Sequence, residues 1–401
     1  MFLKTAIGAA AAAVAVLAGM VADGDAAFPG ANGRIVFARG APYDGGQSSL
    51  YLLNADGTGL VRLTRGFQHD AQPSWSPNGT KIAFESTRRG DTDVYVVAPD
   101  GSGLKELTFS RGFDGDPAWS PNGGALVFET TRNGKLDIYR IAADGTGETR
   151  LTTAPGDDAD PAWSPDGRRI AFTSDRSGSR QVWVMDADGG GQTQLTSAPN
   201  IGGQNPSWSP DGRRIVFDSD RDSAGNLDIW AMAADGTGQT RLTNSPALDA
   251  LPAYSPNGRS IVFVSDRTAK DNREFFVMSA SGAAQRRLLR DPNRWDMSPD
   301  WGKSAGRHGC TITGTINDDD LIGTPRRDVI CGLGGSDRIR GLGGNDRLVG
   351  GAGADRLEGG SGADTLDARD RRRDVLVGGP GRDTAIADRR LDRLTGVERR
   401  R

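Results

Sequence analysis

Histidine and cysteine, the residues on which many catalytic and metal centres depend, are scarce: the chain has two of each among 401 residues. His69 and His308 are far apart in the sequence, and neither belongs to a metal-ligand spacing such as HExxH. We expect both to be ordinary loop or linker residues. We therefore predict no catalytic residues and no enzyme activity.

A large charge of one sign and long apolar runs are also missing. The formal net charge is −3, so nothing in the overall charge favours nucleic acid or an anionic membrane as a partner. Beyond residue 27 no apolar run is long enough to cross a bilayer, and we expect no membrane span. No helical period of useful length appears either, which favours an all-β protein.

Residues 1–27 have the features of a secretory signal peptide: Lys4, an Ala-rich apolar run, and small residues before Phe28. The alternative, a membrane anchor, is disfavoured because the apolar run is only about 18 residues long and mostly Ala. We predict export to the periplasm or the extracellular space. In that setting Cys310 and Cys331 are expected to form a disulfide.

A repeat of 44 to 47 residues occupies most of the chain. Its clearest marker is PxWSPxG, whose aromatic position recurs at Trp75, Trp119, Trp163, Trp208, Tyr254 and Trp301. Ser-Pro-Asp/Asn-Gly forms β-turns, and the segments after it are rich in β-branched and aromatic residues. Each unit therefore holds four short antiparallel strands, which is typical of a propeller blade.

The two ends of this repeat array predict how the ring closes. The array begins with a second strand at Arg34 to Phe37 and ends with a lone first strand at Trp301. We predict a six-bladed β-propeller over residues 28–303, in which the strand at Trp301 completes the blade that begins at Arg34.

The segments PAWSPDGRRIAFTSDR, from Pro161, and ADGTGQTRLT, from Ala234, resemble the repeats of the TolB-type propeller family. These repeats are also described as PD40 or WD40-like. The resemblance covers residues 34–302, and it implies the same six-bladed fold.

A second repeat, of nine residues, follows a short predicted linker at residues 304–313. Its Asp recurs without a slip at Asp319, Asp328, Asp337, Asp346, Asp355 and Asp364, each with an aliphatic residue two positions later. The register slips by one residue at Asp374 and resumes at Asp383. We predict a parallel β-roll of nonapeptides over residues 314–388, with the aliphatic residues as a thin core.

Two nonapeptides make one coil, so Asp residues 18 apart are expected on the same side of the roll. Asp337 is then paired with Asp355, and Asp346 with Asp364. Gly permits positive φ and exposes backbone carbonyls, while Asp supplies a hard anionic oxygen. Ca²⁺ takes six to eight such oxygen ligands and tolerates irregular geometry. The repeats therefore predict calcium sites.

GGAGADRLE and GGSGADTLD match the RTX, or haemolysin-type, calcium-binding nonapeptide GGxGxDxUx, and two further repeats resemble it. The resemblance implies Ca²⁺ as the cofactor. The carboxylate ligands it implies are Asp337, Asp346, Asp355 and Asp364, with Asp319, Asp328 and Asp383 as weaker ones. The backbone ligands it implies come from Gly332, Gly334, Gly335, Gly341, Gly343, Gly344, Gly350, Gly351, Gly353, Gly359, Gly360 and Gly362. The alternative, a flexible Gly linker, has no reason to keep six Asp–x–aliphatic triplets in phase.

Acidic residues recur just before the Trp segments, in what we expect to be connections between blades. The predicted ligand face comprises Asp70, Asp114, Asp116, Asp157, Asp158, Asp160 and Asp249. Loops on a rigid scaffold often carry binding, and acid there favours a cationic ligand. The alternative is that these residues serve solubility alone. The recurrent Ser-Asp-Arg sequences, such as Asp175 with Arg176, are expected to be structural ion pairs between blades.

Other features favour binding over catalysis. GGSGA at Gly359 resembles a nucleophile elbow but lies among the nonapeptides and lacks the strand–turn–helix context. The Arg-rich tail at residues 389–401 is expected to be a solvated or capping segment, with anionic-polymer binding as the alternative. We predict an exported, monomeric scaffold whose propeller binds a protein, peptide or glycan. The alternatives are a calcium-stabilised structural component of the cell surface or matrix and, less favoured, a propeller hydrolase or lyase.

Overall fold

The computed structural model describes residues 32–40, 47–66, 68–222, 225–268, 273–289, 294–303, 310–388 and 391–400. Within these ranges every regular element is a β-strand, so the all-β prediction is confirmed. The predicted signal peptide, most of the predicted linker and His308 lie outside the described residues. No helix in the described ranges is long and apolar enough to cross a membrane.

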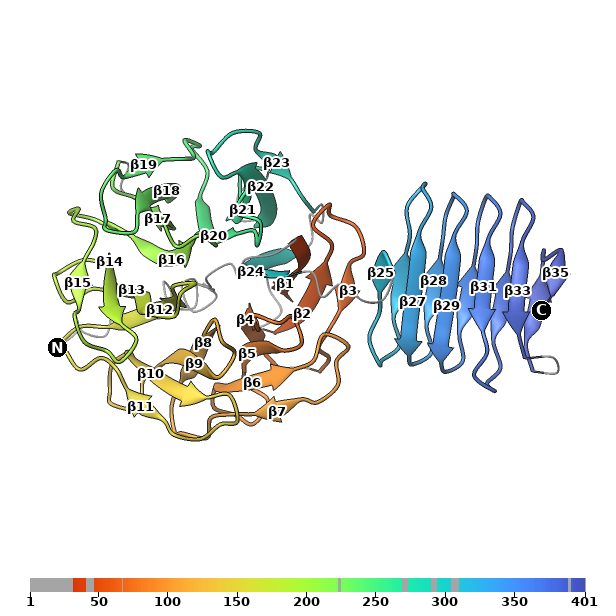
Figure 1. Ribbon diagram of the computed structural model, residues 1–401, viewed down its shortest axis with the longest axis horizontal. Coiled ribbons are helices and arrows are strands. Elements are labelled where there is room, and N and C mark those ends of the chain that lie inside the picture. The colour runs from red at the N-terminus through yellow and green to blue at the C-terminus, as the bar shows by residue number, and fades with distance from the viewer. Residues whose placement is uncertain are drawn as a thin grey trace. The chain divides into compact units, whose positions relative to one another are not determined.

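Six four-stranded antiparallel sheets form a ring of blades (Figure 1). Blade 1 contains β24 (Trp295–Lys303), β1 (Asn32–Gly40), β2 (Ser48–Leu53) and β3 (Val61–Arg62). Blade 2 contains β4 (Asp70–Trp75), β5 (Ile82–Ser86), β6 (Asp93–Val97) and β7 (Lys105–Glu106). Blade 3 contains β8 (Asp114–Trp119), β9 (Ala125–Thr130), β10 (Asp137–Ala142) and β11 (Thr149–Arg150). The first strand of each blade lies innermost in the ring.

The other three blades repeat this order. Blade 4 contains β12 (Asp158–Trp163), β13 (Arg169–Ser174), β14 (Gln181–Asp186) and β15 (Thr193–Gln194). Blade 5 contains β16 (Gln204–Trp208), β17 (Arg214–Ser219), β18 (Asp228–Ala233) and β19 (Thr240–Arg241). Blade 6 contains β20 (Asp249–Tyr254), β21 (Ser260–Ser265), β22 (Glu274–Ser279) and β23 (Arg286–Arg287).

The ring closes as predicted, because β24 pairs antiparallel with β1 inside blade 1. In this register Trp301 lies opposite Ile35 and Asp296 lies opposite Arg39. The Arg39 guanidinium donates to both carboxylate oxygens of Asp296, at 2.5 and 2.8 Å, and both side chains are buried. The last strand of the array is thus joined to the first by main-chain pairing and by a buried ion pair.

The cores lie between neighbouring blades. Trp119 of β8 packs in one cluster with Ala83, Val94 and Val96 of the preceding blade. The repeated Phe of the second strand, Phe128 in this cluster, is fully buried. The aromatic marker of the sequence repeat is therefore the contact that fastens each blade to the one before it, which explains why it recurs in every unit.

The C-terminal unit is a β-roll of two parallel sheets, which appears in Figure 1 as a stack of strands. One sheet contains β25 (Ile312–Thr313), β27 (Val329–Gly334), β29 (Arg347–Ala352), β31 (Thr365–Ala368), β33 (Thr384–Ala387) and β35 (Arg399–Arg400). The other contains β26 (Asp320–Ile322), β28 (Arg338–Arg340), β30 (Arg356–Glu358), β32 (Val375–Val377) and β34 (Arg393–Thr395). The two sheets enclose the aliphatic residues of the repeats, including Leu321, Ile330, Ile339, Leu348, Leu357 and Leu366, all with no exposed area.

The roll continues beyond the predicted end at residue 388. β34 and β35 extend the two sheets by parallel pairing with β32 and β33, so the residues expected to be a solvated or capping segment contain two further strands. Leu394 and Val397 pack against the same core. The nine-residue motif is no longer visible here, but the alternation of an inward aliphatic residue persists.

Candidate functional site

Two columns of Asp side chains run along the roll, at the turns that connect the two sheets. In each column Oδ1 of one Asp accepts the backbone N–H of the Asp one coil earlier, at 2.8 to 2.9 Å. One column contains Asp319, Asp337, Asp355 and Asp374, and the other contains Asp328, Asp346, Asp364 and Asp383. All eight are at most 7% exposed. Asp337 thus lies beside Asp355, and Asp346 beside Asp364, as the 18-residue spacing predicts.

The second carboxylate oxygen, Oδ2, is buried without a hydrogen-bond partner in six of these residues. They are Asp337, Asp346, Asp355, Asp364, Asp374 and Asp383. A buried carboxylate oxygen with no partner is costly. Six equivalent ones, repeated at the same position of successive turns, match the donor set that a hard cation requires.

In the turns that contain Gly, the first Gly makes room for this oxygen. A Cβ on Gly332 would lie 2.2 Å from Oδ2 of Asp337, and one on Gly350 would lie 2.3 Å from Oδ2 of Asp355. The same Cβ on Gly332 would also lie 2.3 Å from the carbonyl oxygen of Gly350 in the next coil. Any larger residue would therefore fill the space between the carboxylate and the stacked carbonyls.

The remaining predicted Gly ligands lie in the same turns. Positive φ values occur at Gly335, Gly344, Gly351, Gly353, Gly360 and Gly362. Leu333 and Leu342, which stand at the second Gly position of the imperfect repeats, adopt the same conformation with φ of 78° and 75°. The imperfect repeats therefore keep the turn shape of the perfect ones, at a cost in backbone strain.

Burial raises the pKa of these carboxyls in the absence of a cation. It raises the pKa of Asp337 to about 7 and those of Asp346 and Asp374 to about 6. The pKa values of Asp355, Asp364 and Asp383 are raised by the same cause. Burial therefore makes ionisation of these carboxyls costly, and positive charge in the turns, such as Ca²⁺ would supply, would favour the ionised form.

Asp319 and Asp328 differ from the other six, because Thr occupies the second position of their turns. Oδ2 of Asp328 accepts the backbone N–H of Thr324 at 2.7 Å and its hydroxyl at 2.9 Å. Oδ2 of Asp319 accepts the equivalent pair from Thr315 at 2.6 and 3.0 Å. Protein donors thus hold the oxygen that is unpartnered elsewhere, and weaker calcium binding at these two positions stays a prediction.

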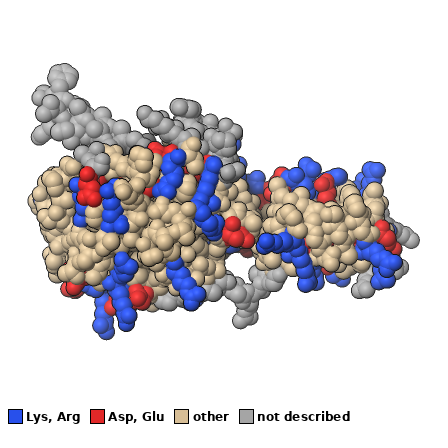
Figure 2. Space-filling model, turned by 90° about the horizontal axis from the view of Figure 1, so that it is seen from above, with Lys and Arg blue, Asp and Glu red and all other residues tan. Residues whose placement is uncertain are grey.

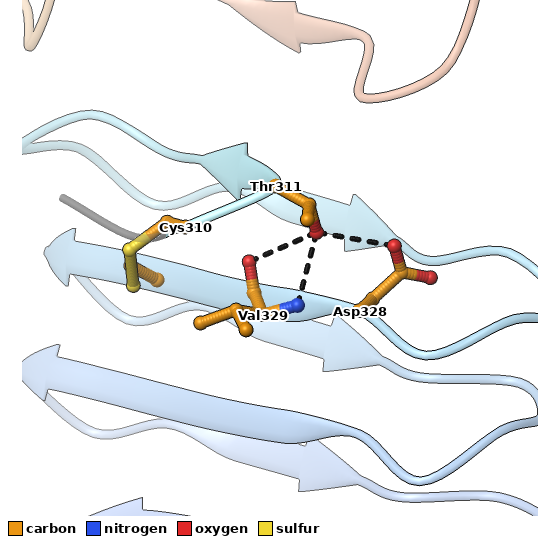
Figure 3. The surroundings of a disulfide bond; sticks show 5 residues. Cys310, Thr311, Asp328 and Val329 are labelled. Carbon is orange, nitrogen blue, oxygen red and sulfur yellow. Dashed lines mark hydrogen bonds between the residues drawn. A yellow bond between two sulfur atoms is a disulfide. The ribbon is translucent and has the colours of Figure 1, made fainter. Parts of the chain in front are cut away.

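The N-terminal edge of the roll is closed by the predicted disulfide between Cys310 and Cys331. Beside it, the Thr311 hydroxyl bonds Oδ1 of Asp328 at 3.1 Å and accepts the Val329 N–H at 2.9 Å (Figure 3). Asp328 is the first Asp of its column. The Thr311 hydroxyl therefore bonds its Oδ1 in place of the backbone N–H of a preceding Asp.

Sequence reasoning missed several members of the columns. Asp374 is 1% exposed, and its Oδ1 accepts the N–H of Asp355 although the two residues are 19 apart. At the far end, Asp392 and Glu398 accept the N–H groups of Asp374 and Asp383. The one-residue slip was visible in the sequence, but the turn absorbs the extra residue and the column continues.

The predicted acidic ligand face of the propeller needs correction. Asp70, Asp114, Asp158 and Asp249 have no exposed area, and they begin inner strands instead of lying in connecting loops. Asp116 and Asp160 are also buried, and of the seven residues only Asp157 is exposed. The inner strands begin further upstream of the Trp segment than the acidic, turn-like sequence suggested. Residues expected in loops are therefore paired within a sheet.

The four buried Asp residues at the strand starts are held by arginines of the Ser-Asp-Arg sequences or their equivalents. Arg176 donates to Asp158 at 2.7 Å and stacks over the rings of Phe172 and Trp183. The corresponding pairs are Arg88 with Asp70, Arg132 with Asp114, and Arg267 with Asp249. These are structural ion pairs, as expected, but each lies within one blade and not between blades.

An inner acidic cluster, defined here as Asp116, Glu129 and Asp160, lies on blades 3 and 4. Oxygen atoms of the three buried side chains lie within 4.8 Å of one another, although the residues are 13 to 44 apart in sequence. Oε2 of Glu129 accepts the N–H of Asp160 at 3.0 Å. Burial raises the pKa of Glu129 to about 8, and it also raises the pKa of Asp160. The cluster can hold protons, a metal ion or a cationic group of a ligand.

Backbone conformation places two of these residues. The first strand of every blade contains an irregularity near its start, where φ is positive at Gln72, Asp116, Asp160, Asn205, Leu251 and Ser298. A positive φ at a residue other than Gly is strained. It recurs at this one position around the ring, so it belongs to the architecture, and only in blades 3 and 4 does it place Asp there.

The geometry thus defines an all-β protein of two classes of repeat, a six-bladed propeller and a nonapeptide roll built around carboxylate columns. Protein-family profiles match the description "TolB beta propeller domain" over residues 12–114, 110–223 and 197–308. The description "RTX calcium-binding nonapeptide repeat (4 copies)" matches residues 313–348 and 332–366. The chain belongs to the TolB β-propeller family and carries RTX calcium-binding repeats.

Solved structures agree with this assignment. TolB from Acinetobacter baumannii is 25% identical, with a TM-score of 0.62 over 68% of this chain and 67% of that one. A putative TolB from Agrobacterium tumefaciens is 22% identical, with a TM-score of 0.52 over 66% and 97%. A chain of a nidogen/laminin complex is 8% identical, with a TM-score of 0.56 over 68% and 98%. The last two show the fold alone. No curated protein matches the chain.

Proposed function

We propose that the chain is an exported, non-catalytic binding protein whose C-terminal roll is ordered by calcium. The observation that carries the calcium part is the set of six buried, unpartnered Oδ2 oxygens in successive turns. Asp337, Asp346, Asp355, Asp364, Asp374 and Asp383 would supply the carboxylates. Carbonyls of the neighbouring turns, most of them from Gly, would complete the sites. Bound Ca²⁺ would supply the positive charge that lets the buried columns ionise.

The expected stabilisation follows from mass action. Extracellular calcium modules bind with dissociation constants of about 10⁻⁴ to 10⁻³ M. At about 1 mM calcium, a site of about 10⁻⁴ M adds roughly 1.4 kcal/mol to the stability of the folded form. Several such sites are enough to decide whether a small unit with little apolar bulk is folded.

Hydrogen exchange of the full chain tests this proposal with an internal control. All eight Trp residues lie between Trp75 and Trp301, so Trp fluorescence reports on the propeller alone. Calcium at 1 mM is expected to raise the protection of backbone amides in residues 310–400, and chelator to remove it, in both oxidised and reduced protein. The fluorescence melting temperature is expected to change little. Equal protection in calcium and chelator would refute the calcium proposal.

For the propeller we propose recognition of a cationic group of a protein, peptide or glycan ligand. The inner acidic cluster supports this choice, because three carboxylates share one small volume. Ligand capture from native extracellular material, with the Glu129→Gln and Asp160→Asn variants beside the wild type, tests it. Loss of capture in both variants, with unchanged melting temperature or an increase, supports binding there. Undiminished capture would place the ligand elsewhere. A chain that captures nothing would favour the alternative, a calcium-stabilised structural component.

A further inference from the structure

The roll carries a basic surface that the calcium columns do not explain. From residue 314 onward the chain has 17 Arg and no Lys, against 16 Asp and Glu. Eight of those acidic residues are the buried column Asp residues, from Asp319 to Asp383. The side chains that face solvent are therefore strongly biased towards Arg, even though the overall charge of this part of the chain is close to zero.

Some of these exposed Arg residues form a row on one sheet. Arg338 of β28 and Arg356 of β30 are direct register partners, and Arg393 of β34 stands two strands further along the same row. The strand between them places Val375 in this row. Adjacent strands lie about 4.8 Å apart, so the row presents guanidinium groups at multiples of that spacing.

The strand that has no Arg in this row, β32, follows a turn that is rich in Arg. Arg371, Arg372 and Arg373 lie in the turn immediately before β32, where other turns carry Gly. All three are exposed, as are the three arginines of the row. We define the basic face as Arg338, Arg356, Arg371, Arg372, Arg373 and Arg393. Figure 2 shows basic side chains projecting from the roll.

Few carboxylates offset this face. Asp320, which lies beside Arg338 in the same row, pairs with Arg340 at 3.1 Å. Glu358 contacts both Arg356, at 2.5 Å, and Arg338, at 3.6 Å, so one carboxylate serves two guanidinium groups. Asp370, in the same turn as the three arginines, accepts the backbone N–H groups of Arg372 and Gly353. In the described part of the roll, the nearby carboxylates are thus largely committed to ion pairs or to the main chain.

We propose that the basic face binds an acidic polysaccharide, one that bears carboxylate or sulfate groups along an extended chain. Arg suits such groups because its planar guanidinium donates two parallel hydrogen bonds to them. The sequence after Trp301 contains no Phe, Tyr or Trp. The face therefore offers no ring on which nucleic-acid bases could stack and no aromatic anchor for a membrane. Recognition by repeated charge on a flat, regular sheet fits a linear polyanion best.

This inference rests on the proposed calcium-bound roll in one respect. Bound calcium would neutralise the buried Asp columns. One column contains Asp337 and Asp355, the residues directly before Arg338 and Arg356, and its charge would otherwise weaken the field of the basic face. Calcium is therefore expected to strengthen polyanion binding, and the polyanion to strengthen calcium binding by the same factor.

The test uses the full chain with dextran sulfate, and unmodified dextran as the uncharged control, in 1 mM calcium over a series of salt concentrations. The triple change Arg338→Gln, Arg356→Gln and Arg393→Gln is compared with Arg326→Gln, Arg327→Gln and Arg347→Gln. The second set removes three exposed arginines of the same roll from outside the face. Circular dichroism verifies that both variants fold as the wild type does.

We expect binding of dextran sulfate and none of dextran. The face variant should lose at least tenfold in affinity, with a salt dependence shallower by roughly two to three ions. The control variant should change less than threefold. Equal losses in the two variants, binding of dextran, or tighter binding of double-stranded DNA at equal charge would each overturn the inference. Binding that persists in chelator with the same loss in the face variant would uphold the inference and contradict the calcium proposal. Calcium-dependent protection of the amides without dextran sulfate binding would uphold the calcium proposal and contradict the inference.

Discussion

The backbone N–H of Asp337 donates a 2.9 Å hydrogen bond to Oδ1 of Asp355, one coil further along the roll. The same bond joins every successive pair in both columns. Each of the six accepting Asp residues thus commits one oxygen to holding the neighbouring coil and leaves the other inside its own turn. Structural and metal-binding roles are divided between the two oxygens of one carboxylate, so substitutions can separate them.

Asp355→Asn is expected to separate these roles. The amide oxygen can still accept the Asp337 N–H, but the buried charge is lost. In chelator we expect the roll to be at least as stable as in the wild type, because burial raises the pKa of Asp355 and makes its ionisation costly. In calcium we expect the midpoint of the order transition, followed by far-UV circular dichroism, to shift at least tenfold to higher calcium.

The matched control for this change is Asp320→Asn, which removes the same charge one residue after a column Asp but from a largely exposed side chain. It is expected to leave the calcium midpoint unchanged within twofold. If the two variants shifted the midpoint equally, general electrostatics and not a specific ligand would account for the calcium effect.

Asp328 and Asp346 provide a second matched pair, since they lie in one column on successive coils. Thr324 already satisfies Oδ2 of Asp328, whereas Oδ2 of Asp346 has no partner. Asp346→Asn is therefore expected to raise the calcium midpoint at least five times more than Asp328→Asn does, in the same titration. A larger shift of the calcium midpoint for Asp328→Asn would show that calcium displaces the Thr324 donors from Oδ2 of Asp328.

Most of the fold could be predicted from the sequence, because both units are built from sequence repeats. The Trp segments, the Gly turns and the Asp–x–aliphatic triplets each recur at fixed spacing, and both β units are built by stacking one element on copies of itself. Ring closure could be predicted because the first and last repeats are incomplete in complementary ways. The aliphatic position of the nonapeptides reveals the core of the roll even where the Gly pattern fades.

Contacts between distant, non-repeating residues could not be predicted in this way. Asp116, Glu129 and Asp160 meet because two blades place different parts of their strands against each other, and no local pattern encodes that approach. The role of Asp158 was misjudged for a related reason. Its partner Arg176 follows the next strand, and the ion pair exists only once the two strands are paired.

The Arg39–Asp296 pair gives a test of ring closure. Asp296→Ala leaves the Arg39 guanidinium buried beside an apolar replacement, and breaking a buried pair in this way costs about 3 to 5 kcal/mol. For a unit of this size we expect the Trp-fluorescence melting temperature to fall by about 10 °C. Asp91→Ala, at an exposed position in the turn before β6, is the control and is expected to change it by less than 2 °C. Equal melting temperatures for the two variants would mean that closure does not limit propeller stability.

The inner acidic cluster predicts an unusual pH dependence of propeller stability. The folded-state pKa of Glu129 is raised to about 8, chiefly by burial. Burial likewise raises the pKa of Asp218, which lies in β17 outside the cluster, to about 7. A carboxyl with a raised folded-state pKa binds its proton more tightly when folded than when unfolded. The folded state is therefore penalised as soon as the unfolded carboxyl ionises, above about pH 4.5, and the penalty grows until the pH passes the folded-state pKa.

We therefore expect the Trp-fluorescence melting temperature, measured in chelator at constant ionic strength, to fall between pH 5 and pH 8.5. Glu129→Gln removes the titrating group but keeps an oxygen that can accept the Asp160 N–H. It is expected to flatten this decline and to raise the melting temperature at pH 8 by roughly 5 °C, with little effect at pH 5. Glu148→Gln, at an exposed position of blade 3, is the control and should leave the profile unchanged. A wild-type profile that rises from pH 5 to pH 8.5, or one that Glu129→Gln does not alter, would show that the cluster is ionised and compensated in the folded protein.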